Sequence, residues 1–311
     1  MPQGSILGPL LFLLYINDII ASSNVLKFIL FADDTSLYFS HKNKSEAYKI
    51  LNLELSKITE WLAANKLSLN VGKSKLLVFH NQRKSKSNDP DDNVGNVNQD
   101  DDVEYKLLIN GEALQEVEYA KYLGVLIDNK LKWDHQIAAI KLKLSKGVGL
   151  LAKIRHYAPS SVVRSLYFSF INPYTDYNLL NWGMAALTNL DPINKKIKKA
   201  IRIISFKDSD HPSTPLFKEL KILPLTEAIQ MRNAKFMWKL VNGYLPLSLS
   251  SQFNHNDRTP YSKSLSRLES LSRFVLYAGP ECWETLPDKL KEIKTPNSFS
   301  NSVKSHLLNT L

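Results

Sequence analysis

The sequence contains a single cysteine, Cys282, among 311 residues. One cysteine excludes a framework of disulfide bonds, and so low a cysteine content is typical of a reducing compartment. The seven histidines are scattered, and none stands at a metal-ligand spacing from the cysteine, which excludes a Cys/His zinc knuckle. Because no histidine-bearing pattern accompanies Cys282, we expect its thiol to be a small packed group rather than a nucleophile.

Long hydrophobic segments are also absent from the sequence. The apolar run at residues 6–16 is about half the length that a helix needs to cross a membrane. No lysine or arginine precedes this run, so the charged start of a secretory signal is missing. We therefore expect a buried helix over residues 10–20, no membrane partner, and an intracellular location in the nucleus or the cytoplasm.

Acidic residues are in deficit. There are 30 Asp and Glu against 40 Lys and Arg, which gives a formal net charge of +10 and a pI near 9.4. An excess of this sign favours a polyanionic partner such as nucleic acid. Apolar residues make up 44% of the chain and aromatic residues 10%, which is ample for hydrophobic cores, and the length allows two domains.

Two adjacent aspartates, Asp33 and Asp34, lie between two strand-like runs at residues 25–31 and 36–40. Like charges so close together repel unless a cation lies between them. Carboxylates together with substrate phosphates are the usual ligands of Mg²⁺, and two such ions clamp the attacking and leaving oxygens in phosphoryl transfer. The pattern predicts a metal-binding hairpin. A polar turn is the alternative, since aspartate is an ordinary turn residue.

Other motifs stand in a fixed order around the aspartates. They are Pro-Gln-Gly-Ser at residues 2–5, Phe-Ala-Asp-Asp at 31–34, Lys-Ser-Lys at 73–75 and Tyr-Leu-Gly at 122–124. This ordered set resembles the reverse transcriptase of non-LTR (LINE-type, jockey-like) retrotransposons. The resemblance implies an RNA-directed DNA polymerase in which a primer hydroxyl attacks the α-phosphate of a nucleotide. An RNA template, a DNA primer and deoxynucleotide triphosphates would be its partners, with Mg²⁺ or Mn²⁺ as the cofactor.

The resemblance implies roles at the hairpin. Asp33 would bind metal directly and act in catalysis, and Asp34 would be a second metal ligand. Phe31 and Ala32 would place the hairpin, with the small alanine leaving room beside the primer end.

The remaining motifs would surround the substrates. Gln3 and Gly4 would line the template and nucleotide side. Lys73 or Lys75 would donate a proton to the departing pyrophosphate or hold phosphate; an exposed surface lysine is the alternative reading. The primer grip would be formed by Tyr122, Leu123 and Gly124.

Members of this family hold their two metals with three carboxylates, the third on a strand upstream of the Pro-Gln-Gly block. The sequence starts at Met1, directly before that block, so we expect the N-terminal polymerase portion to be missing. The chain would then be a C-terminal fragment, inactive alone, with an exposed apolar patch where its palm helix lacks a neighbour. A non-catalytic nucleic-acid-binding remnant and a decayed copy without selected function are the alternatives.

The periodicity predicts a mixture of helices and strands, and the resemblance implies an α+β fold with a partial polymerase palm followed by a mainly helical thumb and C-terminal region. An amphipathic helix is expected over residues 45–65, a strand over 75–79, a hairpin turn at Asn110-Gly111, and a further strand of the same sheet over 122–127. The apolar stripe of the first helix consists of Ala47, Leu51, Leu55, Ile58 and Leu62. From Trp133 onward the chain is expected to be helical, with a stripe at three- and four-residue spacing formed by Ile137, Ile140, Leu144, Val148 and Leu151. The predicted divisions are the palm (1–80), a flexible acidic insertion (81–104), a palm–thumb junction (105–134), a basic helical thumb (135–210) and a retroelement tail of unknown role (211–311).

The thumb-like region has the most distinctive charge pattern. Between residues 121 and 210, 15 basic residues stand against 6 acidic ones. A helix is expected over residues 191–204, and we expect part of its basic face to contact nucleic-acid phosphates, although such a face is often only solvated. The basic residues on this helix are Lys195, Lys196, Lys198, Lys199 and Arg202.

Overall fold

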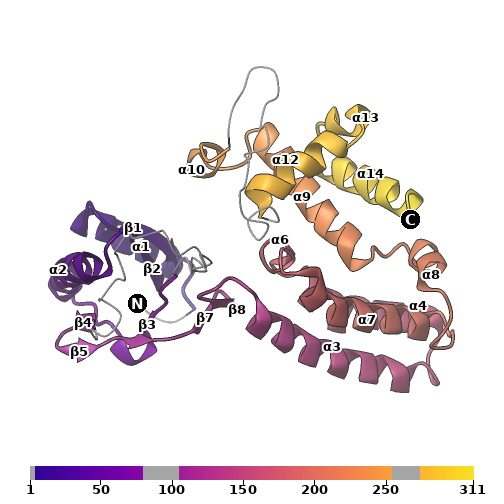
Figure 1. Cartoon of the computed structure of the whole chain (residues 1–311), viewed down its shortest axis with the longest axis horizontal. Helices are drawn as coiled ribbons and strands as arrows, with labels where there is room; N and C mark the ends of the chain where they lie inside the picture. Colours follow the sequence, from indigo (N-terminus) through magenta and orange to yellow (C-terminus); the bar gives the residue numbers. More distant parts are fainter. Residues whose placement is uncertain (1–3, 80–104, 254–273) are drawn as a thin grey trace, which may run out of the picture. The chain divides into compact units, whose positions relative to one another are not determined.

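The computed structural model describes residues 4–79, 105–253 and 274–311 (Figure 1). Gln3 and the predicted insertion at residues 81–104 lie outside these described residues. The chain divides into two compact units, Met1–Ala120 and Lys121–Leu311. The division falls inside the segment 105–134 that the sequence predicts as a junction. The first unit mixes helices with strands, and the second is mainly helical, so the mixed composition is compatible with an α+β fold.

The first unit follows the predicted order of a helix, a hairpin and a second helix. Asn43 caps that second helix, because its side chain accepts a hydrogen bond from the backbone N–H of Glu46 at 3.1 Å. The elements are α1 (Gly8–Ile16), η1 (Asn17–Ser22), β1 (Lys27–Phe31), β2 (Asp34–Tyr38), α2 (Lys44–Ala64), η2 (Val71–Lys73), β3 (Lys75–Leu76), β4 (Leu108–Ile109), β5 (Glu112–Ala113) and β6 (Gln115–Glu116).

The core of the first unit lies between α2 and the β1–β2 hairpin. Alternate strand residues, Phe28, Leu30 and Leu37, pack against it, while Ile29 on the opposite face is half exposed. The buried residues of α2 include Leu55, Ile58 and Leu62 from the predicted apolar stripe, together with Tyr48 and Glu54, which the stripe does not contain. The hairpin is therefore anchored by one face only.

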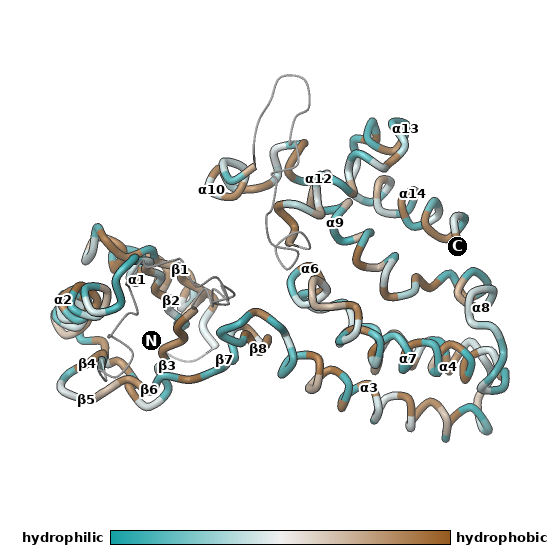
Figure 2. The backbone as a smooth tube through the Cα atoms, viewed as in Figure 1, coloured by the Kyte–Doolittle hydropathy of each residue, from teal (hydrophilic) through white to brown (hydrophobic). Residues whose placement is uncertain are grey.

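Helix α1 departs from the prediction of a buried helix. It is apolar around its whole circumference, as Figure 2 shows by colour, yet Ile16 is its only buried residue. Leu14 exposes 66% of its surface, and Leu10 and Leu13 at least half of theirs. An all-apolar helix normally has protein on every side. The expected exposed apolar patch is therefore present in the described part of this unit.

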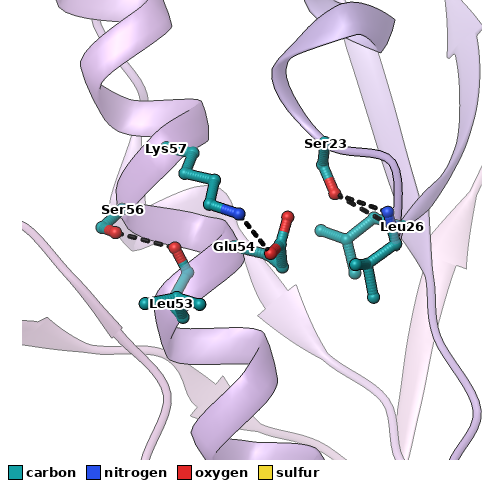
Figure 3. A network of polar contacts seen from close by, with 7 residues as sticks. Ser23, Leu26, Leu53, Glu54, Ser56 and Lys57 are labelled. Atoms are coloured by element: carbon teal, nitrogen blue, oxygen red, sulfur yellow. Dashed lines mark hydrogen bonds and ion pairs between the residues drawn. The ribbon is translucent and has the colours of Figure 1, made fainter.

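A buried carboxylate joins α2 to the segment before β1 (Figure 3). Glu54 is only 2% exposed, and its Oε1 accepts a hydrogen bond from the Lys57 ammonium at 2.6 Å. This bond, and after it the hydroxyl of Ser23, lowers the pKa of Glu54, although burial opposes the shift. Ser23 Oγ in turn accepts from the backbone N–H of Leu26 at 3.1 Å. The network fixes how the chain enters the hairpin.

The short strands of the first unit differ in part from prediction. The Asn110-Gly111 turn joins β4 to β5 with both residues at positive φ (52° and 83°), as the sequence predicts for a type I′ hairpin. The strand expected over residues 75–79 contains only β3, which pairs in parallel with β6. Such a parallel pair joins segments distant in sequence, which local patterns do not reveal.

The second unit begins with a hairpin and continues as packed helices. The β7–β8 hairpin pairs with no other described strand, so the prediction that residues 122–127 continue the sheet of the first unit is wrong. The elements, from the last residues of the first unit onward, are β7 (Tyr119–Tyr122), β8 (Val125–Asp128), α3 (Asp134–Ile154), α4 (Ser160–Phe170), α5 (Asn172–Asp176), α6 (Leu179–Trp182), α7 (Leu187–Ile204), α8 (Ser213–Leu220), α9 (Leu225–Val241), α10 (Leu247–Ser250), α12 (Val275–Thr285), α13 (Asp288–Lys291) and α14 (Pro296–Asn309).

Helices α3 and α7 pack along each other and form the centre of this unit (Figure 1). The predicted stripe of α3, from Ile137 to Leu151 at three- and four-residue spacing, is buried throughout. Helix α7 contains the predicted range but begins at Leu187, with Pro192 inside it. Pro192 is the sixth residue of this helix, so its missing N–H leaves the carbonyl of Thr188 without its usual i→i+4 partner.

The C-terminal helices α9, α12 and α14 surround a second core. The rings of Trp238 and Phe299 stack there with centroids 5.7 Å apart, and Cys282 packs at the edge of this cluster. Among the described residues, the helices are all too short or too polar to cross a bilayer.

Candidate functional site

Asp33 and Asp34 lie at the tip of the β1–β2 hairpin. The register pairs Phe31 with Asp34, so the turn consists of Ala32 and Asp33, and Asp34 is the first residue of β2. Both carboxylates are exposed, whereas the base of the hairpin is anchored in the core. The tip thus presents two sequence-adjacent oxygen-donor groups to solvent on a supported hairpin. Phe31, beside them, is 59% exposed.

The turn holds a non-glycine residue in an unfavourable backbone conformation. Ala32 has a φ of 51°, which lies in the left-handed region. That region costs an L-residue roughly 1–2 kcal/mol because Cβ crowds the following carbonyl. Strain of this kind persists where the surrounding structure imposes it, and it is concentrated at functional sites.

The other residues predicted on the template and nucleotide side are only partly described. Gly4 is exposed, has a φ of 92°, and has open space where a Cβ would be. Only glycine adopts this backbone conformation without strain. One residue further on, the hydroxyl of Ser5 accepts a hydrogen bond from the N–H of Gly8 at 3.1 Å and so helps to start α1.

The structure distinguishes the two candidate lysines. Lys75 Nζ is hydrogen-bonded to Gln115 Oε1, its partner in the parallel β3–β6 pair. Lys73 is exposed at the end of η2, where Asn70 Oδ1 accepts its backbone N–H at 3.2 Å. Lys73, whose backbone is fixed and whose ammonium makes no ion pair with any described residue, is the freer of the two to meet a phosphate.

Residues Tyr122, Leu123 and Gly124 form the turn of the β7–β8 hairpin in the second unit. Leu123 and Gly124 both have positive φ, 44° and 83°. The hydroxyl of Tyr177 donates a hydrogen bond to the carbonyl oxygen of Leu123 at 2.6 Å, and the same ring lies 3.6 Å from where a Cβ on Gly124 would be. Sequence reasoning missed Tyr177, because nothing in the local pattern links it to a turn 54 residues away.

The end of the same hairpin is fixed by a buried carboxylate. Asp128 accepts hydrogen bonds from the backbone N–H groups of Lys130, Lys132 and Trp133, at 3.1, 2.9 and 2.6 Å. These bonds hold the loop that leads into α3. Asp128 is therefore an organising residue of the hairpin, with its oxygens already occupied by N–H groups.

The predicted basic residues of α7 are not equivalent. Lys195 pairs with Asp191 at 2.6 Å, one helical turn earlier, and Arg202 Nε donates to the carbonyl of His211 at 2.7 Å. In the described part of the chain, no ion pair engages the three others, Lys196, Lys198 and Lys199. Three lysines of this face are therefore available to an external anion.

Metal ligands are few around the aspartate pair. Among the described residues, no group of three or more His, Cys, Asp or Glu side chains is placed to hold a metal ion. Asp33 and Asp34 fit a divalent cation in chemical type, because Mg²⁺ is usually held by one or two carboxylates together with waters and substrate phosphates.

Comparisons with known proteins agree with the motifs. Residues 1–127 match the family described as reverse transcriptase (RNA-dependent DNA polymerase). Members of this family generally use divalent metal ions.

The relatives come from mobile elements of Drosophila. The chain is 23% identical over 243 residues to a probable RNA-directed DNA polymerase from transposon X-element of Drosophila melanogaster, covering 76% of this chain and 25% of the relative. It is 24% identical over 251 residues to the RNA-directed DNA polymerase from mobile element jockey of the same species, covering 77% and 25%. The resemblance to LINE-type, non-LTR reverse transcriptases is thereby confirmed.

The extent of these matches is limited. The chain spans about a quarter of the length of the curated relatives it matches. No solved structure gives a significant match.

Proposed function

We propose that this chain contributes the metal-binding hairpin and the primer-side elements of an RNA-directed DNA polymerase of a non-LTR retrotransposon. One observation carries the proposal. Asp33 and Asp34 stand exposed at the tip of a hairpin anchored in the core, within the stretch that matches the reverse transcriptase family.

Asp33 and Asp34 would hold the divalent metal, Mg²⁺ or Mn²⁺, through hard carboxylate oxygens. When bound, such ions neutralise the charge that develops on a transferring phosphoryl group. The contribution of the chain would be to place both carboxylates at the exposed tip of the hairpin, and the register of β1 and β2 supports this placement. The strained Ala32 keeps the turn tight, with only a methyl group beside the acidic tip.

The substrates would be an RNA template, a DNA primer and deoxynucleotide triphosphates. Gln3, Gly4 and Phe31 would lie on the template and nucleotide side, and Lys73 would meet the phosphates of the nucleotide. The primer terminus would be supported by Tyr122, Leu123 and Gly124. Tyr177 stabilises this segment through its hydrogen bond to the carbonyl oxygen of Leu123.

We expect the chain to be inactive alone, since the family holds its metals with three carboxylates and the resemblance assigns only two of them here. The test is extension of a DNA primer on an RNA template by the purified full chain with Mg²⁺ or Mn²⁺ and nucleotides. Extension that disappears in Asp33→Ala would overturn the inactivity while supporting the site. Extension that persists in Asp33→Ala would refute the site itself.

Metal binding can be tested without turnover. Titration of the full chain with Mn²⁺, followed by electron paramagnetic resonance, should detect weak binding that Asp33→Asn/Asp34→Asn removes. Glu46→Gln/Glu60→Gln changes the charge equally at exposed positions on α2 and should leave Mn²⁺ binding unchanged. Equal binding by the Asp33→Asn/Asp34→Asn variant and the native chain would refute the proposed metal site.

A second function, non-catalytic nucleic-acid binding by the face of α7, is favoured by Lys196, Lys198 and Lys199, whose ammonium groups no described carboxylate neutralises. Neutralising lysines that contact phosphates should weaken binding for all sequences and reduce its salt dependence. Replacement of these three lysines by glutamine should therefore weaken RNA binding at low salt, whereas Asp33→Ala should not. Unchanged binding in the lysine variant would exclude this function for α7.

A further inference from the structure

A cluster of cationic side chains lies in the second unit on helices other than α7, mostly in the C-terminal region to which the sequence motifs assign no chemistry. Lys304 of α14 interacts electrostatically with Arg164 of α4 and with Lys221, the residue that follows α8. Lys235 of α9 interacts in the same way with Lys304, Arg232 and Lys239. These six cations, on four helices or helix ends, are linked through Lys304 and Lys235, and we call them the C-terminal cation cluster.

Helix packing and two arginine hydrogen bonds organise the region that carries these cations. Helix α14 packs against both α9 and α8. Arg164 donates from Nε and Nη2 to the carbonyl oxygen of Leu220, at 3.3 and 3.1 Å, which ties α4 to the end of α8. Arg232 Nε donates to Asp176 Oδ1 at 3.0 Å, which ties α9 to α5. The two arginines of the cluster are therefore held by hydrogen bonds, and helix packing brings the backbones that carry the lysines of α9, α14 and the end of α8 near one another.

The cluster has too few anions of its own. Among the described residues, Asp176 is the one carboxylate that interacts with Lys235, and Arg232 already occupies one of its oxygens. Lys221, Lys235, Lys239 and Lys304 make no ion pair within the described part of the chain. Partial burial, followed by the neighbouring cations, lowers the pKa of both Lys235 and Lys304. Held together in this way, like charges repel, and an external anion would remove the repulsion.

We propose that the C-terminal cation cluster binds the phosphate backbone of a nucleic acid, as a second contact surface separate from α7. The choice of a nucleic acid over other polyanions rests on the proposed function, since a polymerase of this kind acts on an RNA template and a DNA strand. A row of phosphates fits six cations spread over several helices better than a single phosphate does. Lysine ammonium groups act as point charges toward phosphate, so the surface would position a strand without reading its bases.

The experiment is fluorescence anisotropy of a short labelled RNA–DNA duplex with the full chain, between about 50 and 200 mM salt. Lys221→Gln/Lys235→Gln/Lys304→Gln should raise the Kd roughly tenfold or more and reduce the salt dependence of log Kd by about 2 to 3. The matched control, Lys49→Gln/Lys289→Gln/Lys294→Gln, removes the same charge at exposed positions outside the cluster and should change the Kd less than about threefold.

A second variant covers the case in which substitution of the partly buried lysines prevents folding. Lys221→Glu/Lys239→Glu changes only exposed side chains of the cluster and should weaken duplex binding at least as strongly. Equal effects of the cluster variants and the control would overturn the proposal. So would unchanged duplex binding accompanied by lost binding to phosphatidylserine vesicles.

The same assay separates this proposal from the polymerase proposal. Asp33→Asn/Asp34→Asn should not weaken duplex binding in the absence of added divalent metal, because these carboxylates repel phosphates and lie outside the cluster. Failure of the catalytic assignment would therefore leave the binding result intact, and failure of the cluster would leave the metal-binding test at Asp33 intact.

Discussion

The hydroxyl of Tyr177, a residue between α5 and α6, donates a hydrogen bond to the carbonyl oxygen of Leu123 at 2.6 Å. This bond supports the turn of the β7–β8 hairpin. Leu123 has a positive φ of 44°, a conformation that costs a side-chain-bearing residue energy. The backbone of Tyr177 is itself held, because its carbonyl accepts the indole N–H of Trp182 at 2.8 Å. Tyr177 thus acts as a positioning residue for the predicted primer grip.

Removing this hydroxyl should loosen the turn without unfolding the unit. Tyr177→Phe keeps the ring beside Gly124 and removes one hydrogen bond, worth about 1 kcal/mol, less where water can replace it. Amide hydrogen exchange at residues 123–125 should therefore become faster. Tyr174→Phe is the control, since that hydroxyl makes no hydrogen bond to any described residue. Equal exchange in both variants would show that the hydroxyl does not hold the turn.

Features that arise within one helix or hairpin could be predicted from the sequence, whereas contacts between residues far apart in the sequence could not. Patterns within one element predicted the aspartate hairpin, the stripe of α3 from Ile137 to Leu151, and the Asn110-Gly111 turn. Interactions between distant elements were missed, among them the support from Tyr177 and the pairing of β3 with β6. Glu54 escaped notice for a related reason, because a charged residue next to an apolar stripe is expected to be in water.

The strained turn at the aspartate pair should tolerate glycine. Ala32→Gly removes the steric cost of a φ of 51°, roughly 1–2 kcal/mol, and adds an unfolded-state entropy cost of about 0.5–1 kcal/mol. We expect a net stabilisation of up to about 1 kcal/mol in urea unfolding monitored in the first unit. Ala32→Val should be destabilising, because a β-branched residue is more crowded at positive φ. A destabilising effect of Ala32→Gly would contradict the left-handed assignment.

The buried carboxylate of Glu54, paired with the half-exposed Lys57, should make the stability of the first unit fall as the pH falls. The pKa of Glu54 is lower in the folded chain than in the unfolded chain, where it is about 4.3. The ionised carboxylate therefore stabilises the fold fully at pH values above the unfolded-state pKa. That effect is lost as the pH falls through the folded-state pKa. The native chain should therefore be more stable than Glu54→Gln at neutral pH, and the difference should vanish in acid.

Urea unfolding at neutral and acidic pH measures this difference. Glu60→Gln, at an exposed position of the same helix, is the matched control and should change stability by no more than about 0.5 kcal/mol. A difference between the native chain and Glu54→Gln that persisted unchanged into acid would argue that packing, and not the carboxylate charge, accounts for it.

The thiol of Cys282 should react slowly. Burial raises its pKa to about 11, and Sγ lies 3.4 Å from the carbonyl oxygen of Gln230. Because the thiolate is the reactive form, a pKa this high leaves on the order of one thiolate per thousand molecules at pH 8. Reaction with Ellman's reagent should be at least tenfold slower in the native chain than in denaturant, and should accelerate as the pH rises. Equal rates would mean that the thiol is neither buried nor shifted.

Alanine substitutions at two glycines of α3, two residues apart, should change the stability of the second unit in opposite directions. A Cβ at Gly147 would lie 2.8 Å from the carbonyl oxygen of Phe170 and 3.2 Å from Cγ1 of Ile171, so the close approach to the end of α4 requires glycine. A Cβ at Gly149 would meet nothing within 4 Å. Gly149→Ala should stabilise the second unit by up to about 1 kcal/mol through helix propensity.

Gly147→Ala receives the same propensity gain but must displace backbone, and overpacking typically costs about 1–3 kcal/mol. Thermal unfolding of the two variants in parallel isolates the packing term, because the helix, the substitution and the gain in propensity are shared. A lower Tm for Gly147→Ala and a higher Tm for Gly149→Ala would establish that α3 and the end of α4 approach closely in solution. Stabilisation by both substitutions would mean that these two segments lie further apart.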